Sequence, residues 1–127
     1  MSHMKHPLAR ARGHGSAKSG VQHWLVQRVS AGMLVLLLPW LTYSLLQLAG
    51  ASHAAAQAFV AEPWNATLLL LSLLLLLYHG MLGLQVVIED YVHQRALELS
   101  LQFALRAATL LAATLGVIHI MKLTLGA

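Results

Sequence analysis

Three long apolar runs limit what this chain can fold into. Neither the first run, residues 29–49, nor the second, residues 66–88, contains a Lys, Arg, Asp or Glu, and the third, residues 101–120, contains only Arg106. An α-helix rises about 1.5 Å per residue, so about 20 residues cross the ~30 Å hydrocarbon core of a bilayer. The sequence therefore predicts an all-α membrane protein with three transmembrane helices, at about 25–49, 66–88 and 99–122.

The composition excludes several other classes of protein. Only 9% of the 127 residues are charged, against about 25% in an average soluble domain, so a free-standing soluble enzyme is not expected. The chain has no Cys, which excludes disulfides, thiolate-bound clusters and a Cys nucleophile. A signal peptide is the competing interpretation of the first run, but its apolar part would be only about 7–15 residues long. Any metal must be held mainly by His, Asp or Glu.

The distribution of basic residues predicts the orientation. Five of the eight Lys and Arg lie in the first 28 residues, which contain no acid, and this basic stretch abuts an apolar run. A membrane is therefore a better partner for it than nucleic acid. By the positive-inside rule the N-terminus is cytoplasmic, the 50–65 loop is outside and the 89–100 loop is inside. We expect a basic arm at residues 1–20 and a three-helix transmembrane unit at residues 21–127. His3, His6 and His14 lie in the arm and are expected to be solvated.

His79 lies near the middle of the second run, where a polar ring is costly and usually faces protein or a cofactor. It fits two roles: a hydrogen bond to a Ser, Thr or carbonyl of a neighbouring helix, or ligation of haem or another metal. Gly80 and Gly83 follow it, and Gly83 is on the same helix face. These glycines fit a trough for a flat porphyrin, and they equally fit close packing of two helices.

A second polar group is expected at the inner end of the helices. Asp90 lies eleven residues after His79, on nearly the same face and about 16 Å further along the helix. Tyr91 follows it, and Arg28 is expected at the same depth, at the inner mouth of the first span. These groups fit a polar ligand head, or an ordinary membrane interface. His23 and Arg28 fit an anionic group such as a haem propionate, or lipid phosphate. His119, near the outer end of the third run, is expected to be an interfacial or helix-contact residue.

Two segments resemble a known family. Residues 27–32, Gln-Arg-Val-Ser-Ala-Gly, resemble the Arg-x-[Ser/Thr]-Ala element that opens the first helix of the D-type hydrophobic membrane anchor of succinate dehydrogenase (respiratory complex II). Residues 79–92 resemble the family pattern His-x-x-x-Gly-x-x-x-[Val/Ile]-x-x-Asp-Tyr-Val. The resemblance covers roughly residues 16–127. The Ser-Pro-His and His-Arg-x-[Ser/Thr]-Gly elements of the C-type subunit are absent, which favours the D-type.

The resemblance implies a function. Such anchors pair with a C-type cytochrome b subunit, and together they hold the flavoprotein and iron–sulfur subunits at the inner face of the bacterial plasma membrane. They share one haem b and bind ubiquinone. The matching positions imply the following roles: haem axial ligand, His79; haem propionate, Arg28; quinone hydrogen bond, Tyr91; quinone site or proton entry, Asp90. His23 is offset by about one residue from the family's His before the first span, which leaves its propionate role open.

No catalytic constellation appears in the sequence, such as His-Glu-x-x-His or a Gly-rich phosphate loop. The chain is therefore expected to be a non-catalytic subunit of an enzyme complex. Two alternatives remain at this stage: a small transporter in which His79 handles protons, and a structural helix-bundle subunit in which it only packs. A transporter more often has several ionisable groups along a path or broken helices.

Overall fold

The computed structural model describes residues 20–126. The expected N-terminal arm, with His3, His6 and His14, therefore lies outside the described residues except for Gly20. Four helices make up the described chain, in the order α2 (Gly20–Leu48), α3 (His53–Ala61), α4 (Pro63–Tyr91) and α5 (Arg95–Leu125). Three of them, α2, α4 and α5, are long and apolar enough to cross a membrane. The prediction of an all-α membrane protein with three spans is confirmed.

α4 and α5 extend beyond the predicted spans at both ends, and α2 begins five residues before its predicted span and ends one residue short of it. Local interactions stabilise some of these ends. At the start of α4 the Glu62 carboxylate accepts a hydrogen bond of 2.9 Å from the Asn65 N–H, and Pro63 occupies the first turn. Proline is suited to that position, since its missing N–H would have no helical partner there. At the end of α5, Gly126 adopts the left-handed conformation with φ 71° and its N–H bonds the Lys122 carbonyl. Glycine takes up this conformation without a steric cost.

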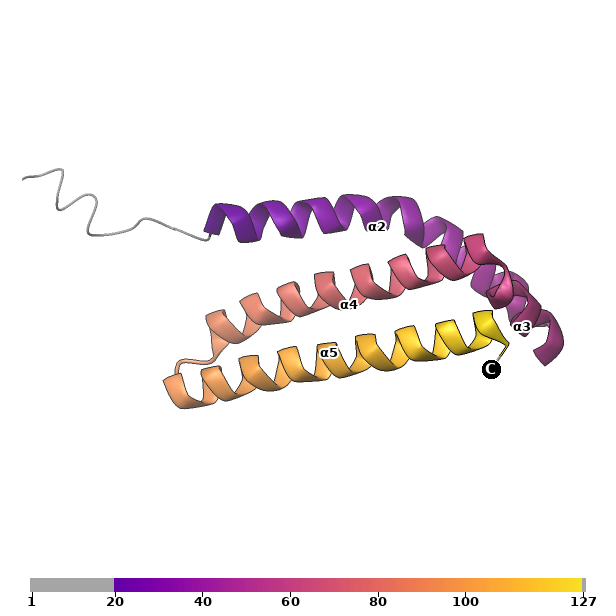
Figure 1. Ribbon diagram of the computed structural model, residues 1–127. Coiled ribbons are helices and arrows are strands. Elements are labelled where there is room, and N and C mark those ends of the chain that lie inside the picture. Colours follow the sequence, from indigo (N-terminus) through magenta and orange to yellow (C-terminus); the bar gives the residue numbers. More distant parts are fainter. Residues whose placement is uncertain (1–19, 127) are drawn as a thin grey trace, which may run out of the picture.

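The connection between α2 and α4 contains a short helix that the apolar pattern did not predict. The segment 50–65 was expected to be a loop, but α3 occupies nine of its residues. The helix is capped by Ser52, whose Oγ accepts from the Ala55 N–H at 3.3 Å. α3 packs across the ends of α4 and α5 (Figure 1). The rings of Phe59 and Trp40 stack with centroids 6.5 Å apart, which joins α3 to α2. This contact explains why a tryptophan lies inside the first apolar run.

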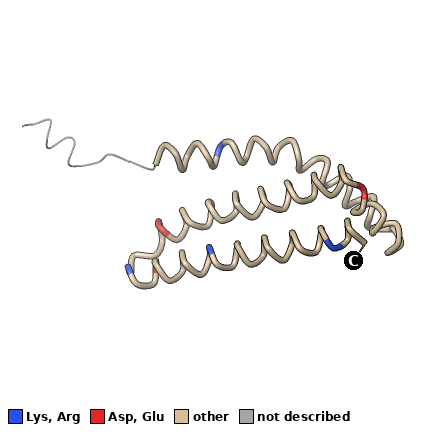
Figure 2. The backbone as a smooth tube through the Cα atoms, viewed as in Figure 1, with Lys and Arg blue, Asp and Glu red and all other residues tan. Residues whose placement is uncertain are grey.

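The long helices form a layer in which α4 lies between α2 and α5 (Figure 1). Figure 2 shows that most of their length carries no charged side chain. The buried residues of α2 and α4 are small or aliphatic, and they include three serines: Ser30, Leu34, Leu37, Ser44, Ala66, Ser72 and Leu82. Small residues let membrane helices approach closely. α5 buries no residue within the described chain.

The central helix is exposed on two sides of the layer. One exposed stripe follows helical spacing along Leu76, Gly80, Leu84, Val87 and Tyr91, and we call it the glycine–tyrosine stripe. The other contains Leu71, Leu74 and Tyr78. Tyr78 and Gly80 are two residues, or about 200°, apart on the helix, so the two stripes face in nearly opposite directions. A layer one helix thick leaves both of these faces for lipid or for other chains.

Candidate functional site

The deepest polar contact of the described chain joins α2 to α4. Ser30 Oγ lies 3.0 Å from His79 Nδ1, and Ser30 is 3% exposed. One of the two alternatives for His79, a hydrogen bond to a serine of a neighbouring helix, is therefore present. This bond uses only one ring nitrogen. Nε2 makes no hydrogen bond within residues 20–126 and remains available to a ligand.

The neighbouring hydrogen bond of Ser30 favours one tautomer of His79. The Ser30 hydroxyl donates to the Gln27 carbonyl at 3.0 Å. A hydroxyl has one proton, so when Ser30 donates to Gln27 its Oγ can accept from His79, an arrangement with the ring proton on Nδ1. Nε2 of the neutral ring then carries a lone pair. Metal-binding histidines commonly have this arrangement, in which the N–H of the second nitrogen is fixed by a protein acceptor. The two interpretations of His79 are therefore compatible in one geometry.

The glycines beside His79 leave space for a flat group. A Cβ placed on Gly80 would meet no other heavy atom within 4 Å, and one placed on Gly83 would meet only Gln27 Nε2, at 3.8 Å. Gly80 is therefore not needed for close packing between helices of this chain. On the Tyr78 side of α4, nearly opposite to Gly80, α2 and α4 border an open cavity of about 210 Å³ lined by Gln22, His23, Val26, Tyr78 and Leu82. Pockets that hold drug-sized ligands have about 300–1,000 Å³, so this cavity does not enclose a large cofactor.

The N-terminal half of α2 turns two further polar groups toward α4. His23 is half-buried, and neither its Nε2 nor Gln27 Oε1, both buried atoms, has a hydrogen-bond partner within residues 20–126. His23, Gln27 and Ser30 are spaced four and three residues apart and therefore share one face of α2. Buried polar atoms usually have a partner, which is often water. This face of α2 thus retains hydrogen-bonding capacity beside His79.

Arg28 does not lie at the depth that the sequence suggested. It is two residues from Ser30 and therefore about 3 Å along the helix from the level of His79, whereas Tyr91 is about 18 Å from that level. The expectation that Arg28, Asp90 and Tyr91 gather at one depth is wrong. Nor does α2 place His23 and Arg28 together, because His23 faces α4 and the exposed Arg28 guanidinium lies 5.4 Å from the centre of the Trp24 ring. The prediction took the start of the apolar run as the inner end of the first span, and therefore placed Arg28 at that depth.

Asp90 and Tyr91 lie at the end of α4, where both are exposed and Tyr91 is 78% exposed. The helix ends at Tyr91, and the chain becomes extended at Val92. Neither side chain makes a hydrogen bond within residues 20–126. The phenol and the carboxylate are therefore free to contact a molecule that approaches along the membrane surface. His119 is exposed too, and its Nδ1 lies 2.7 Å from the Leu115 carbonyl of its own helix.

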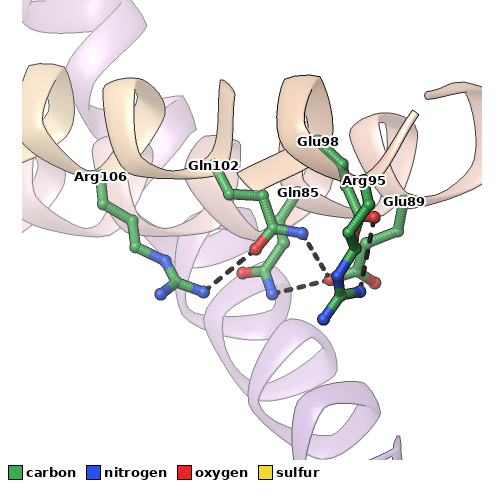
Figure 3. Close-up of polar contacts among 6 residues, drawn as sticks. All are labelled: Gln85, Glu89, Arg95, Glu98, Gln102 and Arg106. Atoms are coloured by element: carbon green, nitrogen blue, oxygen red, sulfur yellow. Dashed lines mark hydrogen bonds and ion pairs between the residues drawn. The ribbon is translucent and has the colours of Figure 1, made fainter. Parts of the chain in front are cut away.

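A group of polar residues between α4 and α5 was not anticipated (Figure 3). Glu89 accepts hydrogen bonds from Gln85 at 3.0 Å and from Gln102 at 3.2 Å. Gln102 in turn accepts from Arg106 at 3.4 Å, and Arg95 pairs with Glu98 at 3.6 Å. We call Gln85, Glu89, Gln102 and Arg106 the polar ladder. The signal for it was the interruption of the third apolar run by Gln102 and Arg106, but the bond of Gln102 to Glu89 on α4 depends on tertiary packing.

These features define a class of protein: a multi-pass membrane protein of three apolar helices, with a histidine hydrogen-bonded to a serine of the neighbouring helix and a tyrosine–carboxylate pair at one end. Residues 2–118 match the family described as succinate dehydrogenase/fumarate reductase transmembrane subunit. The chain belongs to this family.

Curated relatives carry a more specific name. A succinate dehydrogenase hydrophobic membrane anchor subunit from Rickettsia bellii is 39% identical over 104 residues, which covers 82% of this chain and 83% of that protein. The subunit of the same name from Rickettsia conorii is 40% identical over 89 residues, covering 69% and 71%. That from Paracoccus denitrificans is 31% identical over 85 residues, covering 67% and 66%. No solved structure matches the chain significantly. The resemblance to succinate dehydrogenase membrane anchors is confirmed.

Proposed function

We propose that this chain is the membrane anchor subunit of a bacterial succinate dehydrogenase and that it helps to bind haem b and ubiquinone. The observation that carries the proposal is the hydrogen-bond chain from His79 Nδ1 through Ser30 to the Gln27 carbonyl, which leaves Nε2 free. The names of the relatives support the enzyme complex, and the geometry of His79 supports the cofactor. Family membership favours this function over a small transporter or a purely structural bundle.

The residues present fit a haem that is shared with a second chain. Neutral imidazole is a good axial ligand, and His79 Nε2 is the nitrogen that would hold the iron. Gly80 leaves open space next to it, on a side of α4 that no other helix of the described residues covers. Half of the site would therefore come from a C-type partner subunit. The bound group would supply one-electron storage. Arg28, close to the level of His79, is the cation available to a propionate.

Ubiquinone is proposed to bind at the end of α4. Tyr91 would donate its phenolic proton to a quinone carbonyl, and this hydrogen bond strengthens as the carbonyl gains charge during reduction. Asp90 is exposed beside it and can pass protons from the aqueous side. Electrons would come from succinate through a flavoprotein and an iron–sulfur subunit docked at the same face. The chain itself would carry out no succinate chemistry.

The proposed location is the bacterial inner membrane, with the N-terminus in the cytoplasm. The Lys and Arg of the first 28 residues and the lack of any Lys or Arg at residues 50–65 support this orientation. It places the end of α4, with Tyr91, on the side where the two soluble subunits would dock.

Purification of the chain from its own membranes tests the function. We expect a flavin-bearing and an iron–sulfur subunit to co-purify, together with a b-type Soret band and quinone-dependent succinate oxidation. A preparation that contains the chain in good yield, with no flavin, no iron–sulfur subunit and no haem, would refute the proposal.

A further inference from the structure

A groove with a cation at one end lies between α4 and α5, on the side of the layer opposite to the glycine–tyrosine stripe. It has a volume of about 320 Å³. Its lining is almost entirely apolar and comes from two to three turns of each helix: Leu74, Leu77, Tyr78, Met81, Leu110 and Ala113, with Arg106 and Thr109. Arg106 is nearest to the α4–α5 connection among the α5 residues of the lining, so the groove is cationic at this end and apolar beyond it.

The Arg106 guanidinium has hydrogen-bonding capacity left over. It has five N–H donors, and within residues 20–126 it makes one long bond, 3.4 Å, to Gln102. No carboxylate of the described residues lies within 4.0 Å of it, and Glu89, the acid of the polar ladder, accepts from Gln85 and Gln102 instead. Gln102 lies one turn toward the connection, so the bond turns the Arg106 side chain toward the membrane surface. A guanidinium at this position, with free donors, favours a phosphate.

We propose that this groove binds an anionic phospholipid of the inner leaflet, with the phosphate at Arg106 and an acyl chain along Leu74, Leu77 and Leu110. The ligand must be amphiphilic because the cationic and apolar parts of the groove are continuous. Basic pockets between transmembrane helices on the cytoplasmic side are suited to acidic lipid headgroups. The inner leaflet follows from the proposed orientation, in which the α4–α5 connection is cytoplasmic.

The position of the groove favours lipid over a protein subunit. Tyr78, which lines the groove, is about 200° from Gly80 around α4. The proposed function, on which this step depends, assigns the Gly80 side to the partner anchor and the shared haem. The groove then faces the bilayer, where phospholipid is the available amphiphile.

Spin-labelled lipids test the proposal on the complete complex reconstituted in phosphatidylcholine vesicles. Spin-labelled phosphatidylglycerol and phosphatidylcholine are compared by the fraction of each probe that the protein immobilises. A basic residue near the surface is worth about 1 kcal/mol for an acidic lipid, so Arg106 should contribute about a fivefold preference. Arg106→Gln should remove this preference and Arg106→Lys should retain most of it. Arg95→Gln, which removes an equal charge from the exposed end of α5, should change it little.

Two results would overturn the lipid site. One is an equal preference for phosphatidylglycerol in wild type and Arg106→Gln. The other is a photo-reactive amino acid at position 110 that cross-links to another subunit instead of lipid, because a protein would then occupy the groove. Neither measurement depends on haem content or on succinate oxidation. These results can therefore refute the lipid site while the proposed function holds, and the purification experiment can refute the proposed function without testing the lipid site.

Discussion

The two interfaces of α4, with α5 and with α2, differ in how completely their polar groups are hydrogen-bonded. Against α5, the polar side chains bond to one another: Glu89 accepts from both Gln85 and Gln102, and Gln102 accepts from Arg106. Against α2, the polar groups are deeper and incompletely paired, with buried His23 Nε2 and Gln27 Oε1 lacking partners and His79 Nε2 free. Apart from Arg106, the polar groups of the α4–α5 pair are thus bonded to one another, whereas those of the α2–α4 pair keep hydrogen-bonding capacity for another molecule.

The two interfaces of α4 also differ in how closely the helices approach at their glycines. A Cβ on Gly116 of α5 would collide with the Leu73 side chain of α4, so these two helices touch at that point. A Cβ on Gly83, where α4 faces α2, would meet Gln27 at an ordinary contact distance of 3.8 Å. The point of closest approach at Gly116 is therefore tighter than the one at Gly83, which lies one turn from His79. We infer that the function of the chain is concentrated between α2 and α4 and along the glycine–tyrosine stripe.

The largest expected effect is that of His79→Leu. Removal of Nε2 should abolish or strongly alter the b-type spectrum, because leucine offers the iron no ligand. Assembly should be only partly reduced, since neighbouring helices still bury the cofactor edge. His119→Leu is the matched control, because His119 bonds only its own helix within residues 20–126 and its replacement should leave the haem unchanged. Haem content per purified complex measures both variants, and unchanged content in His79→Leu would exclude it as the ligand.

Tyr91→Phe should have the next largest effect. The substitution retains the ring and removes one hydrogen-bond donor. A hydrogen bond to a quinone carbonyl that becomes charged contributes about 1.5–3 kcal/mol, so quinone reduction should fall roughly ten- to hundredfold. Haem content and activity with an artificial acceptor at the flavin should survive, since His79 lies about 18 Å away along the helix. Tyr78→Phe, on the opposite stripe, is the control and should retain quinone reduction. If both variants reduce quinone as fast as wild type, Tyr91 is only an interfacial anchor.

Ser30→Ala isolates the hydrogen bond between α2 and α4. The substitution removes the hydrogen-bond partner of His79 Nδ1. Loss of a residue that orients a metal ligand typically lowers metal affinity about 10- to 100-fold, and we expect haem retention to weaken about tenfold. Ser44→Ala is matched in residue type, helix and burial, but Ser44 Oγ bonds only the Trp40 carbonyl of its own helix. We expect it to keep wild-type haem. Rates of haem loss to an excess of an apoprotein acceptor compare the two variants, and equal rates would show that Ser30 does not orient the ligand.

The sequence predicted what depends on local pattern. The three spans followed from the length of the apolar runs, and the family from the spacing of His79, Gly83, Asp90 and Tyr91. It did not predict α3, because its sequence His-Ala-Ala-Ala-Gln-Ala-Phe-Val-Ala is too short for a span and is stabilised by Ser52 and by contact with α4 and α5.

Partners across helices were not predictable either. Ser30 was one of several serines in apolar runs, and its pairing with His79 depends on the register of α2 against α4. The same register corrected the depth of Arg28. The polar ladder joins residues up to 21 positions apart, from Gln85 to Arg106, through packing that no single run encodes.

The smallest expected effect compares the two interfaces directly. Gly116→Ala inserts a methyl group against Leu73, and overpacking of this kind costs about 1–3 kcal/mol. Replacing a helical glycine by alanine also stabilises the helix by about 0.5–1 kcal/mol, so the net loss of folding stability should be roughly 0–2 kcal/mol. Gly83→Ala meets only an ordinary contact and should be neutral or slightly stabilising. Both are made in the His79→Leu background, so that haem binding does not contribute. The temperature at which the chain is lost from the purified complex should be a few degrees lower for Gly116→Ala than for Gly83→Ala, and the opposite order would mean that the α2–α4 interface is the tighter one.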